Sequence, residues 1–319
     1  VQPRPGVGFP MDLALADTEG QLLANGITTA FLGATLSWEP GLRSLDAWRA
    51  LLEGLGARAW TCDMRVHLRF EAFNLDALDA AEADIAAGRA HLLAFNDHTP
   101  AILRKLSDPV EGAKYAARAH MGMAAFAALA ERVAAGAPRV AAGRARLAAS
   151  ARAAGIPMLS HDDATLADRA MFRALGARVS EFPLSREVGA AARAGGDHVV
   201  MGCPNVVRGG SHLGWASAAA LAEEGICDVL ASDYYYPAMA RAARIMAGRG
   251  VLDWERSWDL VSANPARAAG LADRGRIAPG ARADAALLDP ESEEVVATVA
   301  AGRIAYLSAE GARRLGGVE

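Results

Sequence analysis

Short apolar runs alternate with alanine-rich stretches between residues 27 and 271 of the chain. The runs are rich in β-branched and other apolar residues, and the stretches between them repeat apolar positions at helical spacing. This alternation is typical of βα units that build a parallel sheet. Seven runs predict strands, at Ile27–Gly33, Ala59–Glu71, Ala90–His98, Pro157–His161, Arg178–Phe182, His198–Gly202 and Asp228–Asp233.

Helices are predicted between these strands, at Leu75–Ala87, Glu111–Ala134 and Ala142–Ala154. Gly155 follows the last of them as a C-cap, because a short connection into a strand needs a left-handed residue there. Seven βα units are one short of a (β/α)8 barrel. An open barrel exposes two sheet edges, which natural folds avoid. We therefore expect a TIM-like (β/α)8 barrel whose first strand lies upstream of Val1.

The pattern changes after Leu271. A Pro-Gly turn leads into an apolar strand within 273–289, and Glu294–Tyr306 is typical of a β-hairpin. Such a segment is too small to be stable alone, so we expect it to pack on the barrel, with partner strands upstream of residue 1. The predicted organisation is a hydrolase barrel at 1–271 and a small β segment at 272–319.

Composition narrows the class of protein. The 319 residues suffice for one barrel domain, and no apolar run reaches the ~18 residues of a membrane helix. A net charge of −4 argues against nucleic acid as a partner, so an anionic small molecule would have to be held by local basic groups or a metal. The cysteines, Cys62, Cys203 and Cys227, form no CxxC pair and predict free thiols. We expect a cytoplasmic protein, and assembly as a homo-oligomer is left open.

Polar residues stand where five of the predicted strands end. Chemistry in (β/α) barrels is built at the carboxyl ends of the strands. Singly, Asp162, Asp163 or Asp233 could be an ordinary helix N-cap. As a set they predict a divalent metal site, because mixed histidine and carboxylate ligands suit Zn²⁺ or Mn²⁺. The residues are Glu71, Asp97, His98, His161, Asp162, Asp163, Glu181 and Asp233.

Roles within this set follow from metal chemistry. A divalent metal lowers the pKa of a bound water toward ~7, and Asp233 is the predicted general base that takes up the proton. Only Lys105 and Lys114 are lysines, and neither lies on a predicted strand. A carboxylated lysine is therefore disfavoured as a metal bridge, which leaves Glu71 as the bridging candidate. Zinc is the expected metal, with manganese or iron as alternatives.

A second cluster, Met201–His212, follows the sixth predicted strand. Barrel phosphate sites often use the late βα loops. Arg208 offers a planar fork for phosphate, and Gly209 and Gly210 let backbone N–H groups approach anionic oxygens. The alternative is a plain glycine-rich loop. His67 and Arg69 share a strand face with Glu71 because of the two-residue period. One of the tyrosines at 234–236 could line the pocket.

Several strings taken together resemble one family. They are Asn96–Pro100, Ser160–Thr165, Glu181–Pro183, Pro204–His212 and Ala231–Tyr235, and Ser262–Gly270 resembles a generic amidohydrolase C-terminus. The chain is thereby similar, over nearly its whole length, to the amidohydrolase-superfamily alpha-D-ribose 1-methylphosphonate 5-triphosphate diphosphatases of the carbon–phosphorus lyase pathway. The sequence departs from the family's pattern at two places. No histidine-containing metal motif precedes Pro3, and Ala101 follows Pro100 where the family commonly continues with Gly-Gln.

The resemblance implies a metal-dependent hydrolase that releases pyrophosphate from a phosphorylated ribosyl substrate. Metal and general-base positions would fall on Glu71, His98, His161 and Asp233. The implied substrate-binding residues are Arg69, Asp162, Asn205, Arg208, Gly209, Gly210, Ser211 and His212. The alternatives are an amidohydrolase or deaminase acting on a different small substrate, and a non-catalytic ligand-binding barrel with an incomplete metal site.

Overall fold

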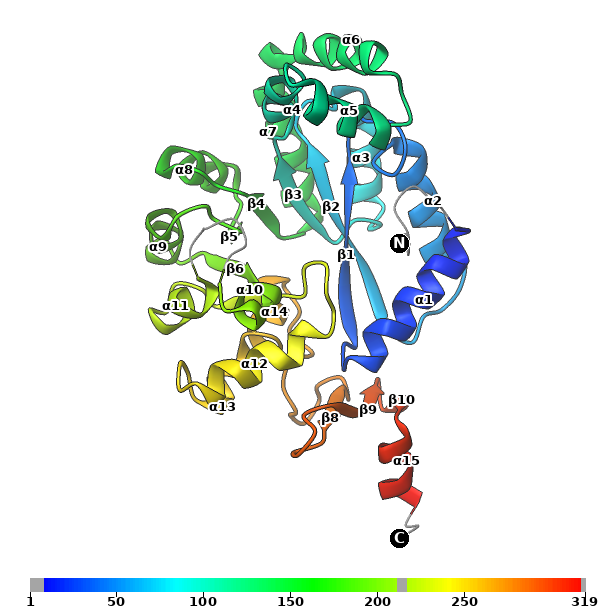
Figure 1. Cartoon of the computed structure of the whole chain (residues 1–319), viewed down its shortest axis with the longest axis vertical. Helices are drawn as coiled ribbons and strands as arrows, with labels where there is room; N and C mark the ends of the chain where they lie inside the picture. Colours follow the sequence, from blue (N-terminus) through cyan, green and yellow to red (C-terminus); the bar gives the residue numbers. More distant parts are fainter. Residues whose placement is uncertain (1–8, 211–216, 317–319) are drawn as a thin grey trace.

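The computed structural model describes residues 9–210 and 217–316. Seven parallel strands form one sheet in which each strand pairs with the next along the chain. They are β1 (Thr29–Leu36), β2 (Asp63–Glu71), β3 (Leu92–Asn96), β4 (Met158–His161), β5 (Val179–Glu181), β6 (His198–Gly202) and β7 (Val229–Ala231). The predicted strands are confirmed, and the sheet curves into an open (β/α) barrel (Figure 1). An additional strand upstream of Val1 remains a prediction.

Strand β2 illustrates how the sequence pattern sets the two faces of the sheet. Val66, Leu68 and Phe70 belong to the hydrophobic core between the sheet and its helices. Successive side chains of a strand point to opposite faces, so His67, Arg69 and Glu71 face the interior of the barrel. The predicted sharing of one face by these three polar residues is confirmed.

The barrel interior is apolar below the strand ends. One cluster of buried residues from β3 to β7 fills it, and Ala268 and Ala269, at the end of α14 (Ala263–Ala268), pack against this cluster. The polar interior residues of β2 therefore lie in an interior that is otherwise lined by apolar side chains. The members of the cluster are Leu92, Ala94, Leu159, Val179, Val200 and Val229.

Helices cover the outer face of the sheet (Figure 1). The predicted helix at 75–87 forms as a short 3-10 turn, η1, followed by α3, and the one at 142–154 is the later part of α7, with Gly155 left-handed at its end as expected. The elements are α1 (Met11–Ala24), α2 (Leu45–Gly56), η1 (Leu75–Ala77), α3 (Leu78–Ala86), α7 (Ala137–Ala154), α8 (Leu166–Leu175), α9 (Arg186–Ala194), α10 (Cys203–Arg208), α11 (Ala218–Glu223), α12 (Ala238–Gly248) and α13 (Trp254–Asp259).

A helical insert lies above the carboxyl ends of β1 to β3 (Figure 1). It consists of α4 (Thr99–Lys105), α5 (Pro109–Arg118) and α6 (Met123–Ala134). The prediction of one helix from 111 to 134 was wrong. The chain breaks at His120, whose φ is 53°, and Gly122 becomes the N-cap of α6. Alanine-rich periodicity continued across this break, so the pattern concealed it.

The C-terminal segment forms the predicted small sheet. Its antiparallel strands, in the order β10-β9-β8, are β8 (Ala285–Leu288), β9 (Val295–Ala300) and β10 (Arg303–Leu307), and α15 (Ala309–Gly316) follows. Ala301 and Gly302 both have positive φ, as a tight hairpin turn requires. The Thr298 hydroxyl donates to the Leu23 carbonyl at 2.7 Å, which ties this sheet to α1. A domain boundary at 271/272 remains a prediction.

Two further expectations concern cysteines and membranes. Cys62, Cys203 and Cys227 are free and buried, as predicted. Among the described residues, the helices lack the combination of length and apolar character that would let one of them cross a membrane.

Candidate metal and active site

Three side chains at the ends of β3 and β4 converge into a group that could hold a metal ion. His98 follows β3, His161 ends β4 and Asp162 comes next. One ligand atom from each lies within 4.8 Å of the others. Two imidazoles and one carboxylate are a donor set that zinc and related divalent metals accept. Asp162, predicted to bind substrate, is thus placed among the potential metal ligands.

Glu71 is buried beside this group and is hydrogen-bonded to the segment that carries His98. Its carboxylate accepts the backbone N–H of His98 at 3.1 Å, the N–H of Thr99 at 3.2 Å and the Thr99 hydroxyl at 2.8 Å. Nδ1 of His98 lies 3.2 Å from Oε2 of Glu71. A metal-binding histidine commonly donates its second ring nitrogen to a carboxylate, which leaves the other nitrogen's lone pair for the metal. Glu71 is therefore placed to orient His98.

Trp38, in the loop after β1, extends this network. The indole of Trp38 donates to the Thr99 hydroxyl at 2.8 Å, and its ring stacks on Phe126 of α6 with 5.6 Å between centroids. The helical insert is thus connected to Glu71 through Trp38 and Thr99. No local sequence pattern marked these two residues, because they are far apart along the chain.

His161 has polar neighbours on both ring nitrogens. Its Nε2 contacts the guanidinium of Arg69, and its Nδ1 lies 2.9 Å from Oδ2 of Asp162. Oε2 of Glu181 lies 3.9 Å from Nε2. A Cβ atom on Gly33 would lie 3.4 Å from Cδ of Arg69, so β1 borders this side chain at contact distance. Arg69, predicted to bind substrate, is therefore adjacent to the metal-ligand group.

The backbone is left-handed just after three of the strands. Asp162 has φ of 58°, Phe182 has 56° and Asp233 has 54°, and none of them is glycine. Non-glycine residues in this region carry strain that is most often retained at functional sites. The strain coincides with the ends of β4, β5 and β7, where the chemistry was predicted.

The alternative that Asp162, Asp163 or Asp233 is a helix N-cap is wrong. Thr165 caps α8 in a capping box, and Pro237 occupies the N-cap of α12. Asp163 instead lies buried below the rim. Its Oδ2 accepts from Ser160 at 2.6 Å, and Arg169 donates to it at 3.2 Å. Asp163 thus stabilises the turn that presents His161 and Asp162.

Asp233 lies over the end of β6. A Cβ atom on Gly202 would lie 3.5 Å from Oδ2 of Asp233, which is ordinary van der Waals contact and places the carboxylate directly beside the end of this strand. The metal-ligand group found among the described residues contains neither Asp233 nor Glu71. Direct metal binding by these two residues remains a prediction.

The predicted phosphate loop begins as a helix. Residues 203–208 form α10, and Gly209 is its left-handed C-cap with φ of 82°. The N–H of Gly209 donates to Val206 and that of Gly210 to Asn205, at 3.2 and 2.9 Å. The two N–H groups close the helix, so they are not open to an anion as predicted.

Other predicted residues of this loop have mixed outcomes. The side-chain oxygen of Asn205 accepts the N–H of Ala218 at 2.9 Å and so connects α10 to α11. Arg208 is exposed in the last turn of α10, and its contact with a phosphate remains a prediction. Ser211 and His212 lie outside the described residues.

Unpaired polar atoms remain inside the barrel. Among the described residues, Nε2 of His67, Nε of Arg69, Oε2 of Glu181 and both amide atoms of Asn96 are buried without a hydrogen-bond partner. Buried polar groups are nearly always paired, so several together indicate a place for an ion, water or ligand. The interior therefore fits a metal-and-ligand site, although sequence reasoning assigned no role to His67 or Asn96.

Burial shifts the pKa of two ionisable groups, His67 and Asp97. It lowers the pKa of His67 to about 4, with Glu181 acting in the opposite direction. Burial raises the pKa of Asp97, and the ion pair with Arg144 opposes that shift. His67 is therefore neutral at pH 7. Asp97, predicted at the rim, is engaged by Arg144 of α7.

The tyrosines after β7 separate into two kinds. Tyr236 packs with residues of α1, β1 and β2, and burial raises its pKa. Tyr234 and Tyr235 are 63% and 53% exposed. Tyr236 thus packs against the barrel while the other two are exposed, and which tyrosine lines a ligand pocket remains a prediction.

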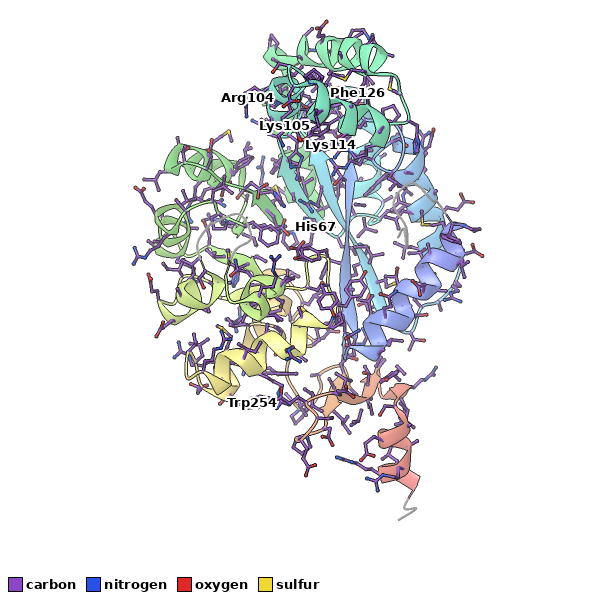
Figure 2. All side chains as sticks on the ribbon, in the orientation of Figure 1. His67, Arg104, Lys105, Lys114, Phe126 and Trp254 are labelled. Carbon is purple, nitrogen blue, oxygen red and sulfur yellow. The ribbon has the colours of Figure 1, made fainter. Side chains whose placement is uncertain are left out.

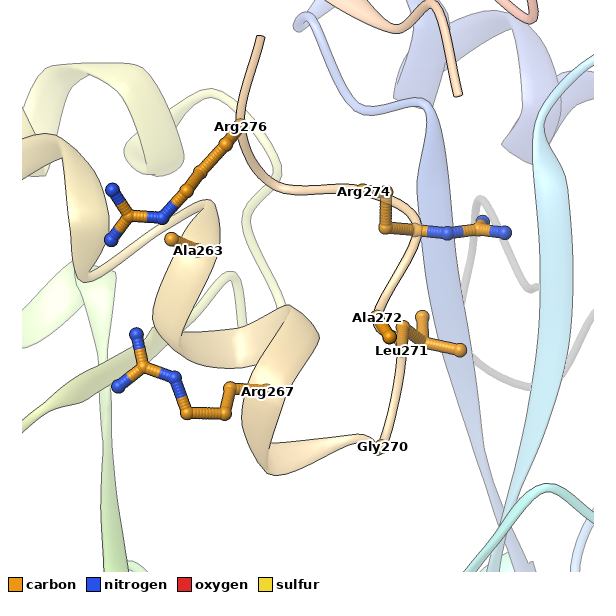
Figure 3. Close-up of a pocket in the computed structure, with 7 residues that line it drawn as sticks. All are labelled: Ala263, Arg267, Gly270, Leu271, Ala272, Arg274 and Arg276. Atoms are coloured by element: carbon orange, nitrogen blue, oxygen red, sulfur yellow. The ribbon is translucent and has the colours of Figure 1, made fainter. Parts of the chain in front are cut away.

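Two surface hollows lie at the opposite end of the strands. One, of about 460 Å³, is lined by the first residues of β4 to β6 and by Arg267. The other, of about 400 Å³, lies beside α14 and the following segment (Figure 3). In it, Arg274 extends toward β1 and β2, where it donates to Thr29 and Asp63 at 2.8 and 2.6 Å. Neither hollow contains a predicted site residue.

Comparisons with known proteins agree with this arrangement. Residues 115–308 match the Amidohydrolase family. The chain is 34% identical over 299 residues to alpha-D-ribose 1-methylphosphonate 5-triphosphate diphosphatase of Escherichia coli (strain K12), covering 89% of this chain and 78% of that protein.

Solved structures of low sequence identity share the fold. A 5-methylcytosine deaminase from Klebsiella pneumoniae has a TM-score of 0.59 at 15% identity, with 96% of this chain and 78% of that chain covered. An N-acetylglucosamine-6-phosphate deacetylase from Pasteurella multocida has a TM-score of 0.61 at 10% identity, with 94% and 82% covered. At such identities the likeness establishes architecture alone.

Proposed function

The chain belongs to the amidohydrolase family, and from this premise we propose that it cleaves a phosphoanhydride of alpha-D-ribose 1-methylphosphonate 5-triphosphate and releases pyrophosphate. The family and the 34% identical diphosphatase establish a hydrolase. The named substrate and the bond cleaved are the proposal. It places the enzyme in phosphonate catabolism in the cytoplasm, a compartment compatible with three free thiols.

The observation that carries the proposal is the group formed by His98, His161 and Asp162 at the carboxyl ends of adjacent strands. Members of the family generally use a divalent metal, and this donor set, beside buried unpaired polar atoms, fits one. When bound, such a metal supplies Lewis acidity that favours loss of a proton from water and neutralises charge on phosphate. We propose zinc, with manganese and iron as alternatives.

Protein groups would perform the remaining steps. Asp233, held over the end of β6, would accept the proton of the attacking water and return it to the leaving oxygen. Arg69 and the exposed Arg208 would neutralise charge that develops on the phosphates. Glu71, fixed by Thr99, would hold His98 in position. In this proposal the chain supplies a proton acceptor, two cationic groups and a carboxylate that orients a metal ligand.

The test is hydrolysis of the ribosyl triphosphate by the purified chain, supplied in turn with Zn²⁺, Mn²⁺ and Fe²⁺. One pyrophosphate and one 5-phosphate should form per substrate consumed, and a chelator should abolish the reaction. The variants His98→Asn and His161→Asn should bind less than one equivalent of metal. Release of single phosphates, or no reaction while bound metal is at least one equivalent, would overturn the proposal.

A matched assay addresses the alternatives. Cyclic amides and aminopyrimidines are the substrates that an amidase or deaminase on this scaffold would take. Turnover of these compounds, with the triphosphate left intact, would replace the proposed reaction. Tight binding of the triphosphate without turnover by metal-loaded protein would indicate the non-catalytic barrel.

A further inference from the structure

The hollow at the amino ends of β4 to β6 has a basic lining. Its volume is about 460 Å³, within the ~300–1,000 Å³ of sites that hold small molecules. Three separate parts of the fold each contribute an arginine to it: Arg152 of α7, Arg178 just before β5, and Arg267 of α14. No aspartate or glutamate is among the described residues that line it. Three guanidiniums without a carboxylate indicate an anionic ligand.

Two of these guanidiniums are not neutralised by an acid. Arg152 donates to the carbonyl of Leu175 at 2.7 Å, a bond that leaves its charge unbalanced. Arg267 is exposed and, within 9–210 and 217–316, makes no hydrogen bond or ion pair. Figure 3 shows it extending away from Arg274, whose guanidinium is engaged by Asp63. Arg152 and Arg267 therefore keep their positive charge available to a ligand.

The third guanidinium shares its acid with two others. Nη1 of Arg178 lies 3.5 Å from Oδ1 of the buried Asp197, while Arg173 lies closer to the same oxygen, at 2.6 Å. Arg169 lies 3.8 Å from the other oxygen of Asp197 and 3.2 Å from Asp163. Three arginines thus face two carboxylates, which leaves a surplus of positive charge. The side chain of Arg178 is 61% exposed, so its guanidinium is accessible from the hollow.

The backbone around the hollow leaves it open. Gly155 and Gly196 follow α7 and α9 with φ of 67° and 79°, and a Cβ on either would meet no other heavy atom within 4 Å. A Cβ on Gly270 would lie 3.5 Å from Cγ of Pro157, so the end of α14 rests against the residue before β4. This contact fixes the helix that carries Arg267 beside the hollow.

The hollow is distinct from the metal-ligand group. Strand β4 begins at Met158, which lines the hollow, and ends at His161, so about 10 Å of strand separates the two. The apolar cluster of the barrel interior, to which α14 packs, lies along these strands. Figure 2 shows a different group of cations, Arg104, Lys105 and Lys114, on the helical insert above the carboxyl ends. The arginines of the hollow are therefore free of any role assigned to the metal-ligand group.

We infer that the hollow bounded by Arg152, Arg178 and Arg267 binds a small anion that carries two or more phosphate or carboxylate groups. Guanidinium forks bind both kinds of group in the same bidentate way. Three cations from separate parts of the fold can contact a ligand at more than one charged group, which favours a multiply charged anion. The inference does not depend on the proposed function, because it uses none of the residues assigned to the reaction.

Calorimetry on the metal-loaded protein tests the inference. The probes are fructose 1,6-bisphosphate and tricarballylate, with fructose as the uncharged control. Arg267→Ala should weaken binding of the preferred probe by about tenfold or more, because it removes charge-assisted hydrogen bonds. Arg267→Lys keeps the charge without the planar fork and should lose less. The probe that binds more tightly identifies the natural ligand as a phosphate or a carboxylate compound.

Arginine modification locates the bound anion. Phenylglyoxal labels accessible guanidiniums, and mass spectrometry of the peptides identifies them. Saturation with the preferred probe should slow labelling of Arg152 and Arg267 by about threefold or more, since a guanidinium held by an anion is shielded from the reagent. Arg249, exposed at the end of α12, should be labelled at the same rate with and without the probe.

Controls separate this site from the catalytic end and from misfolding. Arg208→Ala should bind the probe as wild type does. Arg267→Ala should keep the wild-type metal content and unfolding midpoint, because its side chain is exposed. Failure of both charged probes to bind, unchanged affinity in Arg267→Ala, or loss of binding in Arg208→Ala would overturn the inference.

Discussion

The hydroxyl of Thr99 donates a hydrogen bond of 2.8 Å to Oε1 of Glu71, and both residues are buried. The same hydroxyl accepts from Trp38. Thr99 therefore connects the loop after β1 and the helical insert to the carboxylate that contacts His98. A change in this one hydroxyl should be detected at the metal-ligand group.

Thr99→Val tests that connection. Valine keeps the shape but leaves the Trp38 indole without this acceptor and removes one of the hydrogen bonds to Glu71, which should lower the free energy of unfolding by about 1–3 kcal/mol. Metal affinity should fall by about tenfold or more, as is typical when the partner of a ligand is lost. Chemical denaturation and metal titration measure the two effects. Thr61→Val, at an exposed threonine, is the control, and unchanged metal affinity in Thr99→Val would contradict the prediction.

Asp233→Asn tests the proton acceptor. Asparagine preserves the size of the side chain and cannot take up a proton, so turnover of the triphosphate should drop by roughly 10²- to 10⁴-fold. The metal content should stay at the wild-type level, measured on the same sample by elemental analysis. Asp46→Asn, at an exposed position in α2, should behave as wild type. Near-normal turnover in Asp233→Asn would refute its role as the general base.

The sequence predicted the strands well because each βα unit repeats a local pattern. Apolar runs and their polar ends predicted Glu71, His98, His161 and Asp233 at the carboxyl ends of strands. The two-residue period of β2 also assigned Arg69 to the interior, where it contacts His161. These features depend on neighbours in the chain, which a single sequence displays.

The remaining features depend on contacts across the fold. Trp38 and Thr99 are 61 residues apart, so their hydrogen bond leaves no local signature. The break at His120 lies within an unbroken alanine-rich pattern. The closure of α10 by Gly209 needed the cap geometry, since a glycine pair is equally typical of an anion-binding loop. Long-range packing and backbone conformation decided each of these cases.

Arg208→Ala tests the cationic contribution of α10. Loss of an exposed guanidinium that meets the polyphosphate should raise KM for the triphosphate by about tenfold, with a smaller effect on kcat, because the contact is made in the ground state as well. Steady-state kinetics at two ionic strengths measure both parameters. Arg249→Ala, an exposed arginine at the end of α12, is the control. Equal KM values for Arg208→Ala and wild type would remove Arg208 from the substrate site.

The buried thiols predict a dependence of stability on alkaline pH. Burial raises the pKa of Cys62 and of Cys227 to about 12, and it also raises that of Cys203. Each thiol stays protonated in the folded state but ionises near pH 9 once unfolded. The stabilisation is therefore complete below pH 9 and is lost as pH rises toward the folded-state pKa.

Denaturation midpoints between pH 8 and 11 measure this loss. The midpoint of the wild-type chain should fall with pH, and Cys227→Ala should fall less steeply because it removes one of the titrating groups. A thiol reagent at pH 8 should react slowly with native protein and with all three cysteines after denaturation, since only an accessible thiolate is reactive. Rapid labelling of the native chain, or parallel pH profiles for wild type and Cys227→Ala, would contradict the burial of these thiols as the cause.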